Sequence, residues 1–326
     1  MDLERVINRL GDSWIGYRKA LADSLISESS LLTDINTYLI NTQGKQLRPL
    51  LSLLVASICG EPNEKSYYCA AVSELIHTAT LLHDDVADDA NYRHGKLTVK
   101  VLYSPAASVL TGDYWLAKAL HLLSEKCGFN ILDCYTHAVR ELSVGELIQM
   151  EKANSLDTTE KDYYNIIEKK TASLFMAAIK GGALSVDASK DKLDAVTNFA
   201  LHLGIAFQIK DDIFDYLPNL ETGKEHGIDI IERKITLPLL CAFKKSSLEE
   251  KEIIIELISQ IESKKESSKF ILPINKFVDK YQGIADAQAI LSSHIQSAIN
   301  SLDIFPNNNY KESLLDIAKY VGDRNK

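Results

Sequence analysis

Residues 64–89 read EKSYYCAAVSELIHTATLLHDDVADD, and their apolar positions recur at three- and four-residue spacing. This spacing is the period of an α-helix, because it places the apolar side chains on one face. Gly60 and Pro62 stand just before the stretch and form a helix stop signal. At its other end the stretch runs into a group of aspartates. It therefore predicts a long, mostly apolar helix with carboxylates at its carboxyl end.

The same helical period continues through the rest of the chain. The sequence has only 15 Gly and 7 Pro in 326 residues, whereas strands need turn residues every few positions. We therefore predict an all-α protein. Helices are expected over about 3–25, 30–41, 46–59, 64–89, 105–127, 131–153, 159–184, 189–218, 236–263, 271–302 and 308–321, with loops over 91–104 and 219–235.

The composition does not divide the chain into separate domains. Its length alone would suggest two, at roughly 150 residues per domain. However, there is no Gly/Ser-rich or Pro-rich linker, and the motifs described below lie in both halves. We therefore expect a single helical domain over residues 1–326.

The charge and hydropathy of the chain exclude several classes of function. Its formal net charge is −9 and its pI is about 5.4, which disfavours nucleic-acid binding because phosphate contacts dominate that affinity. The sequence has no apolar run of roughly 18 residues, so no transmembrane segment is expected. The first ten residues, MDLERVINRL, mix both charge signs and do not resemble a secretory signal.

The five cysteines show no metal-binding or redox spacing. No pair of Cys59, Cys69, Cys127, Cys134 and Cys241 has the Cys-x-x-Cys pattern. Most of them lie among apolar helical residues, where a free thiol behaves as a small hydrophobic side chain. We therefore expect free thiols and a reducing, cytoplasmic compartment.

The pattern Asp-Asp-x-x-Asp occurs twice, each time at the end of an apolar helix. The two copies supply the carboxylates of Asp84, Asp85, Asp88, Asp211, Asp212 and Asp215. Positions three or four apart share a helix face, and two carboxylates 4 Å apart repel by roughly 4 kcal/mol at an effective dielectric constant of 20. Carboxylate oxygens suit Mg²⁺, which completes its shell with water and substrate phosphates. The pattern therefore predicts two magnesium-binding motifs.

Basic and polar residues are available for a second anion. Lys45 and Arg48 lie three residues apart at the predicted start of a helix, where the helix dipole favours an anion. His77 lies seven residues before Asp84 on the same stripe of its helix. Further candidates are Arg93, Lys170, Thr171, Gln208, Lys224 and Lys234. Such a set suits two diphosphates, one held through metal ions and the other directly by Lys and Arg.

Together these motifs resemble the trans-isoprenyl diphosphate synthases of the polyprenyl synthetase family. The first Asp motif lies in HTATLLHDDV, residues 77–86, with Arg93 and Gly95 following, and the second lies in FQIKDDIFD, residues 207–215. The segments Gly44–Pro49, Lys170-Thr171 and Gly223-Lys224 through Lys234–Pro238 also match, in the same order.

The resemblance implies a bundle of antiparallel helices around a central cavity, usually paired as a homodimer. It implies three Mg²⁺ ions on an allylic diphosphate, bound by Asp84, Asp88 and Asp211 with support from Asp85, Asp212 and Asp215. The same diphosphate would be contacted by Arg93, Lys170, Lys224, Lys234, Thr171 and Gln208. Isopentenyl diphosphate would be held by Lys45, Arg48 and His77, with Phe207 against it. Lys170 and Lys224 would join the three principal aspartates in catalysis.

One position departs from the family pattern. The family usually has Arg-Arg-Gly after the first motif, with its second Arg on isopentenyl diphosphate, and this chain has Arg93-His94-Gly95. A histidine is only partly charged near neutral pH. We therefore hypothesise that isopentenyl diphosphate binds more weakly and that its binding tightens at lower pH. An unchanged KM for this substrate in His94→Arg across about pH 6–8 would contradict the hypothesis.

The implied reaction is ionisation, condensation and elimination, starting from farnesyl or geranyl diphosphate. Short-chain family members place bulky aromatic residues just before the first motif, whereas this chain has the small residues Ala79 and Thr80 and looks like the long-chain members. An apolar tunnel gains roughly 0.8 kcal/mol per buried CH₂. We therefore expect a product longer than farnesyl, roughly C30–C50. A transient membrane contact for hand-off of this lipid is compatible with the sequence.

Three other functions fit part of the pattern. A class I terpene cyclase also uses Asp-Asp-x-x-Asp and Mg²⁺, but it does not need the group Lys45, Arg48 and His77. A non-catalytic subunit of a heteromeric synthase would be expected to have lost Asp or Lys positions. An acidic cation-binding protein would leave Lys170, Lys224 and Lys234 without a role.

Overall fold

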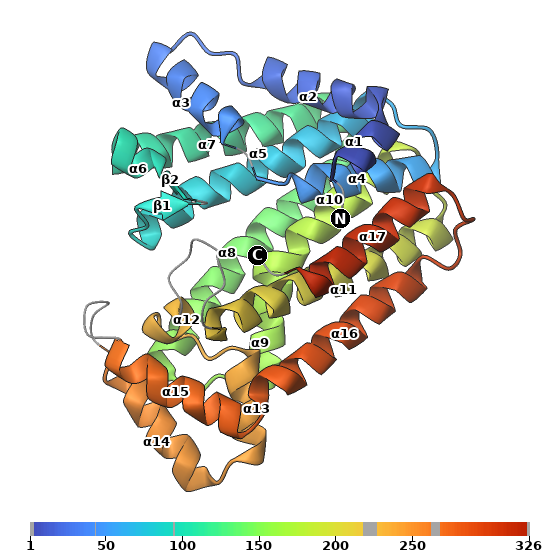
Figure 1. The fold of residues 1–326 in the computed structure, drawn as a ribbon. Helices are drawn as coiled ribbons and strands as arrows, with labels where there is room; N and C mark the ends of the chain where they lie inside the picture. Colours follow the sequence, from blue (N-terminus) through green and yellow to red (C-terminus); the bar gives the residue numbers. More distant parts are fainter. Residues whose placement is uncertain (1–2, 43, 94, 218–226, 262–267, 325–326) are drawn as a thin grey trace. The chain divides into compact units, whose positions relative to one another are not determined.

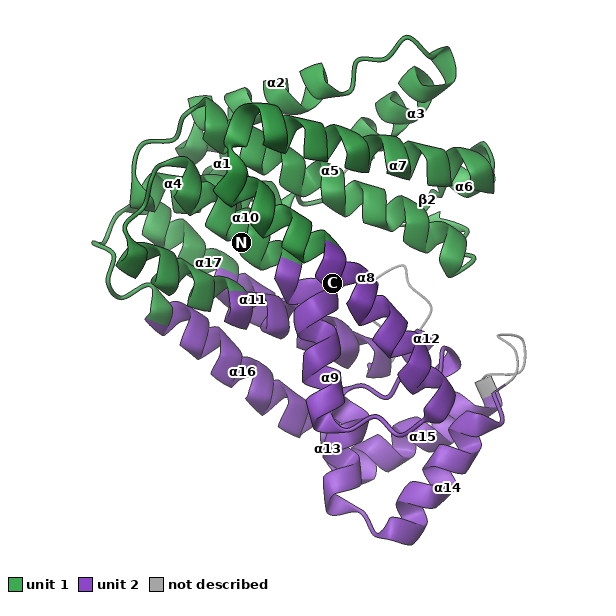
Figure 2. Ribbon diagram, turned by 180° about the vertical axis from the view of Figure 1, so that it is seen from behind, with its two compact units in different colours: residues 1–139, 174–200, 301–317 green, residues 140–173, 201–300, 318–326 purple. Residues whose placement is uncertain are grey.

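The computed structural model describes residues 3–42, 44–93, 95–217, 227–261 and 268–324. These residues are almost all helical, which confirms the predicted all-α class (Figure 1). They fall into two compact units, coloured separately in Figure 2. Unit 1 comprises residues 1–139, 174–200 and 301–317, and unit 2 comprises residues 140–173, 201–300 and 318–326.

Unit 1 contains the first 139 residues of the chain and three later segments of helix. Its elements are α1 (Leu3–Leu10), α2 (Asp12–Ser24), α3 (Ser30–Asn41), α4 (Leu47–Cys59), α5 (Glu64–Ala87), β1 (Tyr92–Arg93), β2 (Lys96–Leu97), α6 (Val99–Leu102), α7 (Pro105–Leu122), a π-helical turn (Leu123–Cys127), the start of α8 (Phe129–Ser155), most of α10 (Ser173–Ser185), the start of α11 (Lys190–Tyr216) and most of α17 (Asn309–Asp323).

Unit 2 begins within α8 and contains the second Asp motif. Its complete elements are α9 (Glu160–Ile167), a π-helical turn (Glu168–Ala172), α12 (Ile228–Ile231), α13 (Leu237–Lys245), α14 (Leu248–Ser259) and α15 (Ser268–Lys280). It also includes nearly all of α16 (Gly283–Ser301), the second part of α11 and the end of α17.

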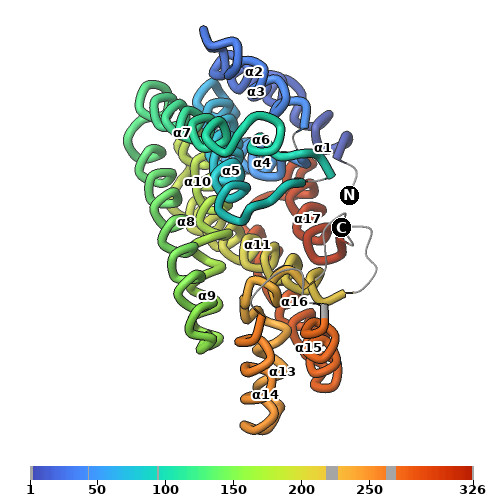
Figure 3. The backbone as a smooth tube through the Cα atoms, turned by 90° about the vertical axis from the view of Figure 1, so that its left-hand side faces the viewer, coloured from blue at the N-terminus to red at the C-terminus, as the bar shows by residue number. Residues whose placement is uncertain are grey.

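Helix α5 is the central helix of unit 1. It packs against α2, α4 and α7, and the tube view shows it between α4 and α7 (Figure 3). Trp115 of α7 is fully buried, and its indole N–H donates a 2.8 Å hydrogen bond to Asn36. The amide of Asn36 in turn donates to the Leu25 carbonyl at 2.8 Å. These hydrogen bonds join α7 to α3 and to the end of α2, and both α7 and α2 pack against the helix that carries the first Asp motif.

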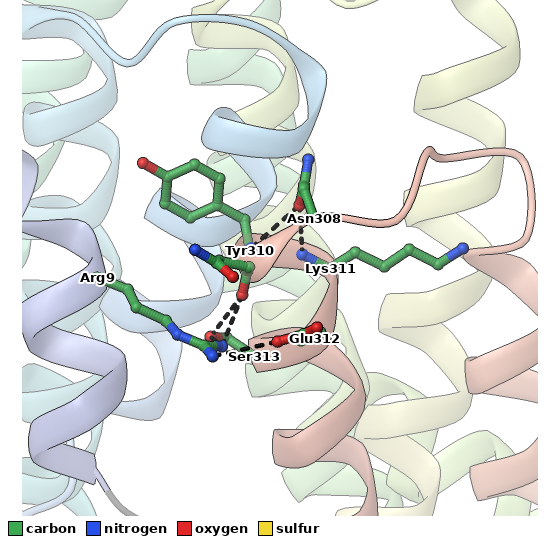
Figure 4. Close-up of polar contacts among 7 residues, drawn as sticks. Arg9, Asn308, Tyr310, Lys311, Glu312 and Ser313 are labelled. Atoms are coloured by element: carbon green, nitrogen blue, oxygen red, sulfur yellow. Dashed lines mark hydrogen bonds and ion pairs between the residues drawn. The ribbon is translucent and has the colours of Figure 1, made fainter.

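Arg9 joins α1 to the start of α17 within unit 1 (Figure 4). Its guanidinium donates hydrogen bonds to the Asn309 carbonyl at 2.8 Å and to the Ser313 hydroxyl at 2.9 Å. It also pairs with Glu312 at 3.1 Å. A planar guanidinium can make all of these contacts at once because its donors form a rigid fork.

Three predicted helices were wrong, because each is two helices. The helix expected over 3–25 breaks at Gly11, which has a φ of 50°. The helix expected over 236–263 breaks because the Ser247 hydroxyl accepts from the Glu250 N–H and caps a new helix. The helix expected over 271–302 breaks at Gln282, which has a φ of 56°. A left-handed residue such as this ends the α-helical hydrogen-bond ladder.

The predicted loop over 91–104 contains regular structure. Strands β1 and β2 pair antiparallel, with Tyr92 opposite Leu97 and Arg93 opposite Lys96, and α6 follows them. Such a hairpin is too short for the alternating pattern that identifies a strand in sequence. The five cysteines are free thiols, as predicted.

Candidate functional site

The first Asp motif lies at the carboxyl end of α5. Asp84 and Asp85 are in its last turn, and Asp88 caps the helix by donating its backbone N–H to the Asp84 carbonyl at 2.8 Å. Asp88 is exposed, Asp84 is half-buried and Asp85 is only 4% exposed. The motif thus presents its first and last carboxylates toward solvent, whereas its second is enclosed.

Arg93 provides the charge that Asp85 needs. Its Nε donates to Asp85 Oδ1 at 2.7 Å. Arg93 lies on β1, and the Tyr38 hydroxyl holds the hairpin by donating to the Leu97 carbonyl at 2.6 Å. The hairpin therefore supports a buried ion pair at the motif. His94, the position that departs from the family pattern, lies outside the described residues.

The segment that carries Lys45 and Arg48 is held by its own side chains. Gln46 has a φ of 50°, and its amide donates to the Tyr17 hydroxyl at 2.8 Å. The Arg48 guanidinium lies 4.5 Å from the centre of the Phe175 ring, a cation–π contact. Lys45 is exposed. The segment thus places two cations at the start of α4, an exposed lysine and an arginine that stacks on an aromatic ring.

Glu74 of α5 is a buried acid beside this segment. It is 5% exposed, and burial raises its pKa to about 7, while Arg48 and a hydrogen bond with Gln46 oppose the rise. His77, one turn further along the helix, is half-buried. The structure therefore brings Gln46, Arg48 and Glu74 together, although sequence analysis did not select Glu74.

The two residues expected to set product length differ in their burial. Ala79 is 1% exposed, so its methyl group lies in the packed interior of unit 1. Thr80 is half-buried, and its hydroxyl donates to the His77 carbonyl at 2.8 Å. The space below the first motif is therefore filled closely around Ala79.

The second Asp motif ends α11 and is linked to several polar side chains of unit 2. Asp212 is 3% exposed and accepts two hydrogen bonds. One comes from the Tyr163 hydroxyl at 2.6 Å and the other from the Gln208 amide at 2.8 Å. Gln208 in turn accepts from the Thr171 hydroxyl at 2.6 Å. These residues form a continuous chain of hydrogen bonds.

Asp215 organises the backbone that follows. Its two carboxylate oxygens accept the N–H groups of Ile228 at 3.0 Å and of Asp229 at 2.9 Å. A carboxylate at the first N–H groups of a helix is stabilised by those unpaired donors and by the helix dipole. Asp215 therefore fixes the start of α12 and, through it, the position of Asp229.

Arg324 contacts the first residue of the second motif. Its Nη2 donates to Asp211 Oδ1 at 2.8 Å and to the Phe207 carbonyl at 2.9 Å. Its guanidinium carbon lies 4.0 Å from the centre of the Phe207 ring. Phe207 thus packs against a cation of its own chain.

A cavity of about 90 Å³ in unit 2 gathers many of the predicted site residues. Those that line it are Lys170, Thr171, Gln208, Asp212 and Lys234. The other polar lining residues are Gln149, Lys152, Thr158, Tyr163, Asp229 and Thr236. One concave site therefore combines carboxylates, lysines and hydroxyls drawn from α8, α9, the π-helical turn after α9, α11, α12 and the segment after α12.

The two cavity lysines that the sequence predicted, Lys170 and Lys234, are each balanced by a carboxylate. Lys170 sits in the π-helical turn and pairs with Glu146, with a further contact of 3.4 Å to Gln149. Lys234 pairs with Glu232 at 2.6 Å. Single π-helical turns interrupt helices most often at functional sites. Lys224 lies outside the described residues.

The acids of this site resist ionisation. Burial and, after it, the charge of Asp229 raise the pKa of Asp212 to about 8. Burial and the charge of Asp215 raise the pKa of Asp229 to about 7. The pKa of Asp215 is raised to about 6, mainly by burial. Crowded carboxylates of this kind favour the uptake of added positive charge.

The donor chemistry of these motifs fits Mg²⁺. Across the described ranges, no group of three or more His, Cys, Asp and Glu side chains forms a metal cage. Mg²⁺ does not require such a cage, because it keeps several waters and uses one or two carboxylates together with substrate phosphates. Asp84 and Asp88 on α5 and Asp211 on α11 offer oxygens of that kind.

Sequence analysis missed Tyr163, Asp229, Glu74 and Arg324. Arg324 is 113 residues from Asp211, so no local pattern connects them. Tyr163 is 49 residues from Asp212 and reads as an ordinary aromatic residue of an amphipathic helix. Asp229 could have been selected, since it ends the Gly-Lys segment that follows the second motif.

Among the residues that the structure describes, no helix is both long and apolar enough to cross a bilayer.

Comparisons with known proteins agree on one family. The polyprenyl synthetase family model matches residues 29–274. Octaprenyl diphosphate synthase of Haemophilus influenzae is 33% identical over 302 residues, covering 92% of this chain and 91% of the relative. Geranylgeranyl diphosphate synthase of Sulfolobus acidocaldarius is 31% identical over 280 residues, covering 83% and 84%.

The fold is shared with solved structures of the same family. Polyprenyl synthase from Caulobacter crescentus CB15, complexed with calcium and isoprenyl diphosphate, superposes with a TM-score of 0.91 at 31% identity. The match covers 100% of this chain and 98% of the other. The chain therefore belongs to the polyprenyl synthetase family of prenyltransferases.

Proposed function

We propose that this protein extends an allylic diphosphate, farnesyl or geranyl, with isopentenyl diphosphate to make a polyprenyl diphosphate. The observation that carries the proposal is the cavity of unit 2. It combines Lys170 and Lys234 with the hydrogen-bond chain from Thr171 through Gln208 to Asp212. Lysines bind diphosphate oxygens, and a buried acid with hydroxyl and amide partners suits a bridging metal ion.

Both Asp motifs are proposed to bind Mg²⁺, three ions in all with the allylic diphosphate. Asp84, Asp88 and Asp211 are the proposed principal ligands, with Asp85, Asp212 and Asp215 in support. Bound Mg²⁺ would stabilise the negative charge that develops on the diphosphate as it leaves the allylic carbon. The raised pKa values of Asp212 and Asp215 support this role, since added cations favour their charged forms.

The remaining residues are proposed to bind and orient the two substrates. Arg93, Lys170, Lys224 and Lys234, with Thr171 and Gln208, would contact the allylic diphosphate. Lys45, Arg48, His77 and His94, with Phe207, would hold isopentenyl diphosphate. Glu146 and Glu232 now balance Lys170 and Lys234, so diphosphate oxygens would replace these carboxylates as partners. The proton lost at the end of the reaction would go to the released diphosphate.

The product is proposed to be longer than farnesyl, roughly C30–C50. The name of the Haemophilus influenzae relative and the small side chains of Ala79 and Thr80 support this length. A relative of similar identity is named geranylgeranyl diphosphate synthase, which implies a shorter product for that protein. Replacing Ala79 by Phe should shorten the product and, because Ala79 is buried, also lower the melting temperature. An unchanged product from a folded variant would contradict the placement of the tunnel.

A homodimer in the cytoplasm is proposed for the assembled enzyme. An exposed apolar strip on α6 and α7 supports a protein partner, because soluble monomers rarely leave such strips uncovered. It consists of Val101, Leu102, Tyr103, Val109 and Leu110, each between 37% and 68% exposed. The five free thiols support a reducing compartment.

Steady-state kinetics of a cavity lysine test the proposal. Lys234→Gln should raise the KM for the allylic diphosphate by about tenfold, because one charge-assisted hydrogen bond is lost. The KM for isopentenyl diphosphate should stay unchanged. Lys161→Gln removes the same charge from an exposed position on α9 and serves as the control. Equal KM values in both variants would contradict the assignment of the cavity.

A further inference from the structure

Asp211 is paired with a cation that belongs to the protein itself. Arg324 follows α17 directly, and its Nη2 bridges Asp211 Oδ1 at 2.8 Å and the Phe207 carbonyl at 2.9 Å. Its guanidinium carbon lies 4.0 Å from the Phe207 ring centre and 5.4 Å from the Phe214 ring centre. A carboxylate, a carbonyl and two ring faces therefore hold this one side chain.

The position of Arg324 depends on the charge of Asp211. The Arg324 side chain is only 10% exposed, and its Nε is buried without a hydrogen bond among the described residues. Lys210, also buried, lies close enough that the charge of Arg324 contributes to lowering the Lys210 pKa, after burial itself. A guanidinium this enclosed requires a counter-ion. Asp211 is the one carboxylate that the structure pairs with it among the described residues.

Asp211 remains open to solvent on its other side. Its side chain is 32% exposed, three times the exposed fraction of Arg324. A cation from solvent can therefore reach the Asp211 carboxylate while Arg324 is still bound to it. Two cations on a single carboxylate oxygen repel one another, so binding of a divalent ion weakens the hold on the guanidinium.

We propose that Arg324 and a divalent cation compete for Asp211, so that Arg324 sets the metal affinity of the second Asp motif. The inference rests on the proposed metal role of Asp211. It assigns Arg324 as a positioning residue that keeps the motif neutralised until metal arrives. The release of Arg324 then moves the end of α17 away from Phe207.

The competition predicts a gain of affinity when the arginine is removed. Isothermal titration with Mn²⁺ alone should show a binding step that Asp211→Asn removes, while any binding at Asp84 and Asp88 remains. Arg324→Gln should tighten that binding by about tenfold, because the metal ion no longer competes with a charge-assisted hydrogen bond to Asp211. Arg324→Lys keeps the charge but not the planar fork, so its Mn²⁺ affinity should lie between those of the wild type and Arg324→Gln. Lys319→Gln removes an equal charge from an exposed position on α17 and should leave the affinity unchanged.

A second measurement needs no variant and guards against a misfolded one. Adding Mn²⁺ to the wild-type protein should speed amide hydrogen exchange at residues 318–324, because their anchor on Asp211 is released. Unchanged or weaker Mn²⁺ affinity in Arg324→Gln, or exchange at 318–324 that Mn²⁺ leaves unchanged or slows, would overturn the proposal. Neither readout uses catalysis. A protein that binds Mn²⁺ in this way but cannot extend an allylic diphosphate would therefore refute the proposed function and leave this inference standing.

Discussion

The Tyr163 hydroxyl donates a 2.6 Å hydrogen bond to Asp212, across 49 residues of sequence. Tyr163 lies on α9 and Asp212 on α11, and both line the cavity of unit 2. Burial disfavours the charge on Asp212 and raises its pKa, while the hydrogen bonds from Tyr163 and Gln208 oppose that rise. Tyr163 therefore favours the charged form of Asp212, which is the form that the proposed metal binding requires.

Tyr163→Phe should raise the Mg²⁺ concentration that the enzyme needs for activity. Without the hydroxyl, the pKa of Asp212 rises further, so less of it is ionised at neutral pH. A hydrogen bond to a charged group contributes about 1.5–3 kcal/mol, so the Mg²⁺ concentration for half-maximal rate should rise by about tenfold or more. Tyr164→Phe is the adjacent control. Identical Mg²⁺ curves for the two variants would show that Tyr163 does not support a ligand.

Glu74→Gln should remove a pH dependence of stability. The pKa of Glu74 is raised from 4.5 to about 7 in the folded protein. Between these two values the folded state binds the extra proton, so the free energy of unfolding falls as pH rises. In urea unfolding, the free energy of unfolding of the wild type should fall between pH 4.5 and 7.5 by about 2–3 kcal/mol more than that of the variant. The exposed Glu61→Gln is the control, and a decline of full wild-type size in Glu74→Gln would contradict the raised pKa.

Arg93→Gln should destabilise unit 1 by removing the guanidinium that pairs with the buried Asp85. Asp85 has a side-chain exposure of 6% and Arg93 of 32%, so solvent screens the pair only in part. Loss of one partner should reduce the free energy of unfolding by about 1–3 kcal/mol. In the double variant Asp85→Asn/Arg93→Gln most of this loss should be recovered, because the charge is gone. A double variant that is less stable than Arg93→Gln alone would argue against a buried ion pair.

Gly182→Ala should be strongly destabilising. A Cβ at this position of α10 would lie 2.1 Å from the Ser52 carbonyl oxygen of α4, and a backbone atom cannot move aside easily. Overpacking of this kind costs about 3 kcal/mol or more. At Gly322 of α17 the nearest atom lies at 3.4 Å, so Gly322→Ala should change stability by no more than about 1 kcal/mol. Equal melting temperatures for the two variants would contradict the close approach of α4 and α10.

The sequence predicted the helical segments well, but it did not predict the positions at which three of the expected helices break into two. Long apolar periodicity was enough to identify α5 and α11, because their buried faces repeat over many turns. The breaks at Gly11 and Gln282 depend on single left-handed residues, and only one of these is a glycine. A non-glycine residue with positive φ carries no local signal that distinguishes it from its helical neighbours.

The candidate site was predictable where its residues form local motifs. Asp212, Gln208 and Lys170 were selected from short patterns, and the structure places all three at one cavity. Tyr163 and Arg324 could not be selected, since only the fold brings them to Asp212 and Asp211. The local pattern therefore identifies the groups that carry charge, whereas the tertiary fold supplies the partners that hold them.

Product analysis tests the central claim most directly. Purified protein would be incubated with farnesyl diphosphate, radiolabelled isopentenyl diphosphate and Mg²⁺, and the dephosphorylated products would be separated by chromatography. We expect a ladder of polyprenols that ends at one length beyond farnesol. Diphosphate release from farnesyl diphosphate without incorporation of label would instead indicate a cyclase. No turnover at all would indicate a non-catalytic subunit, and either result would contradict the account.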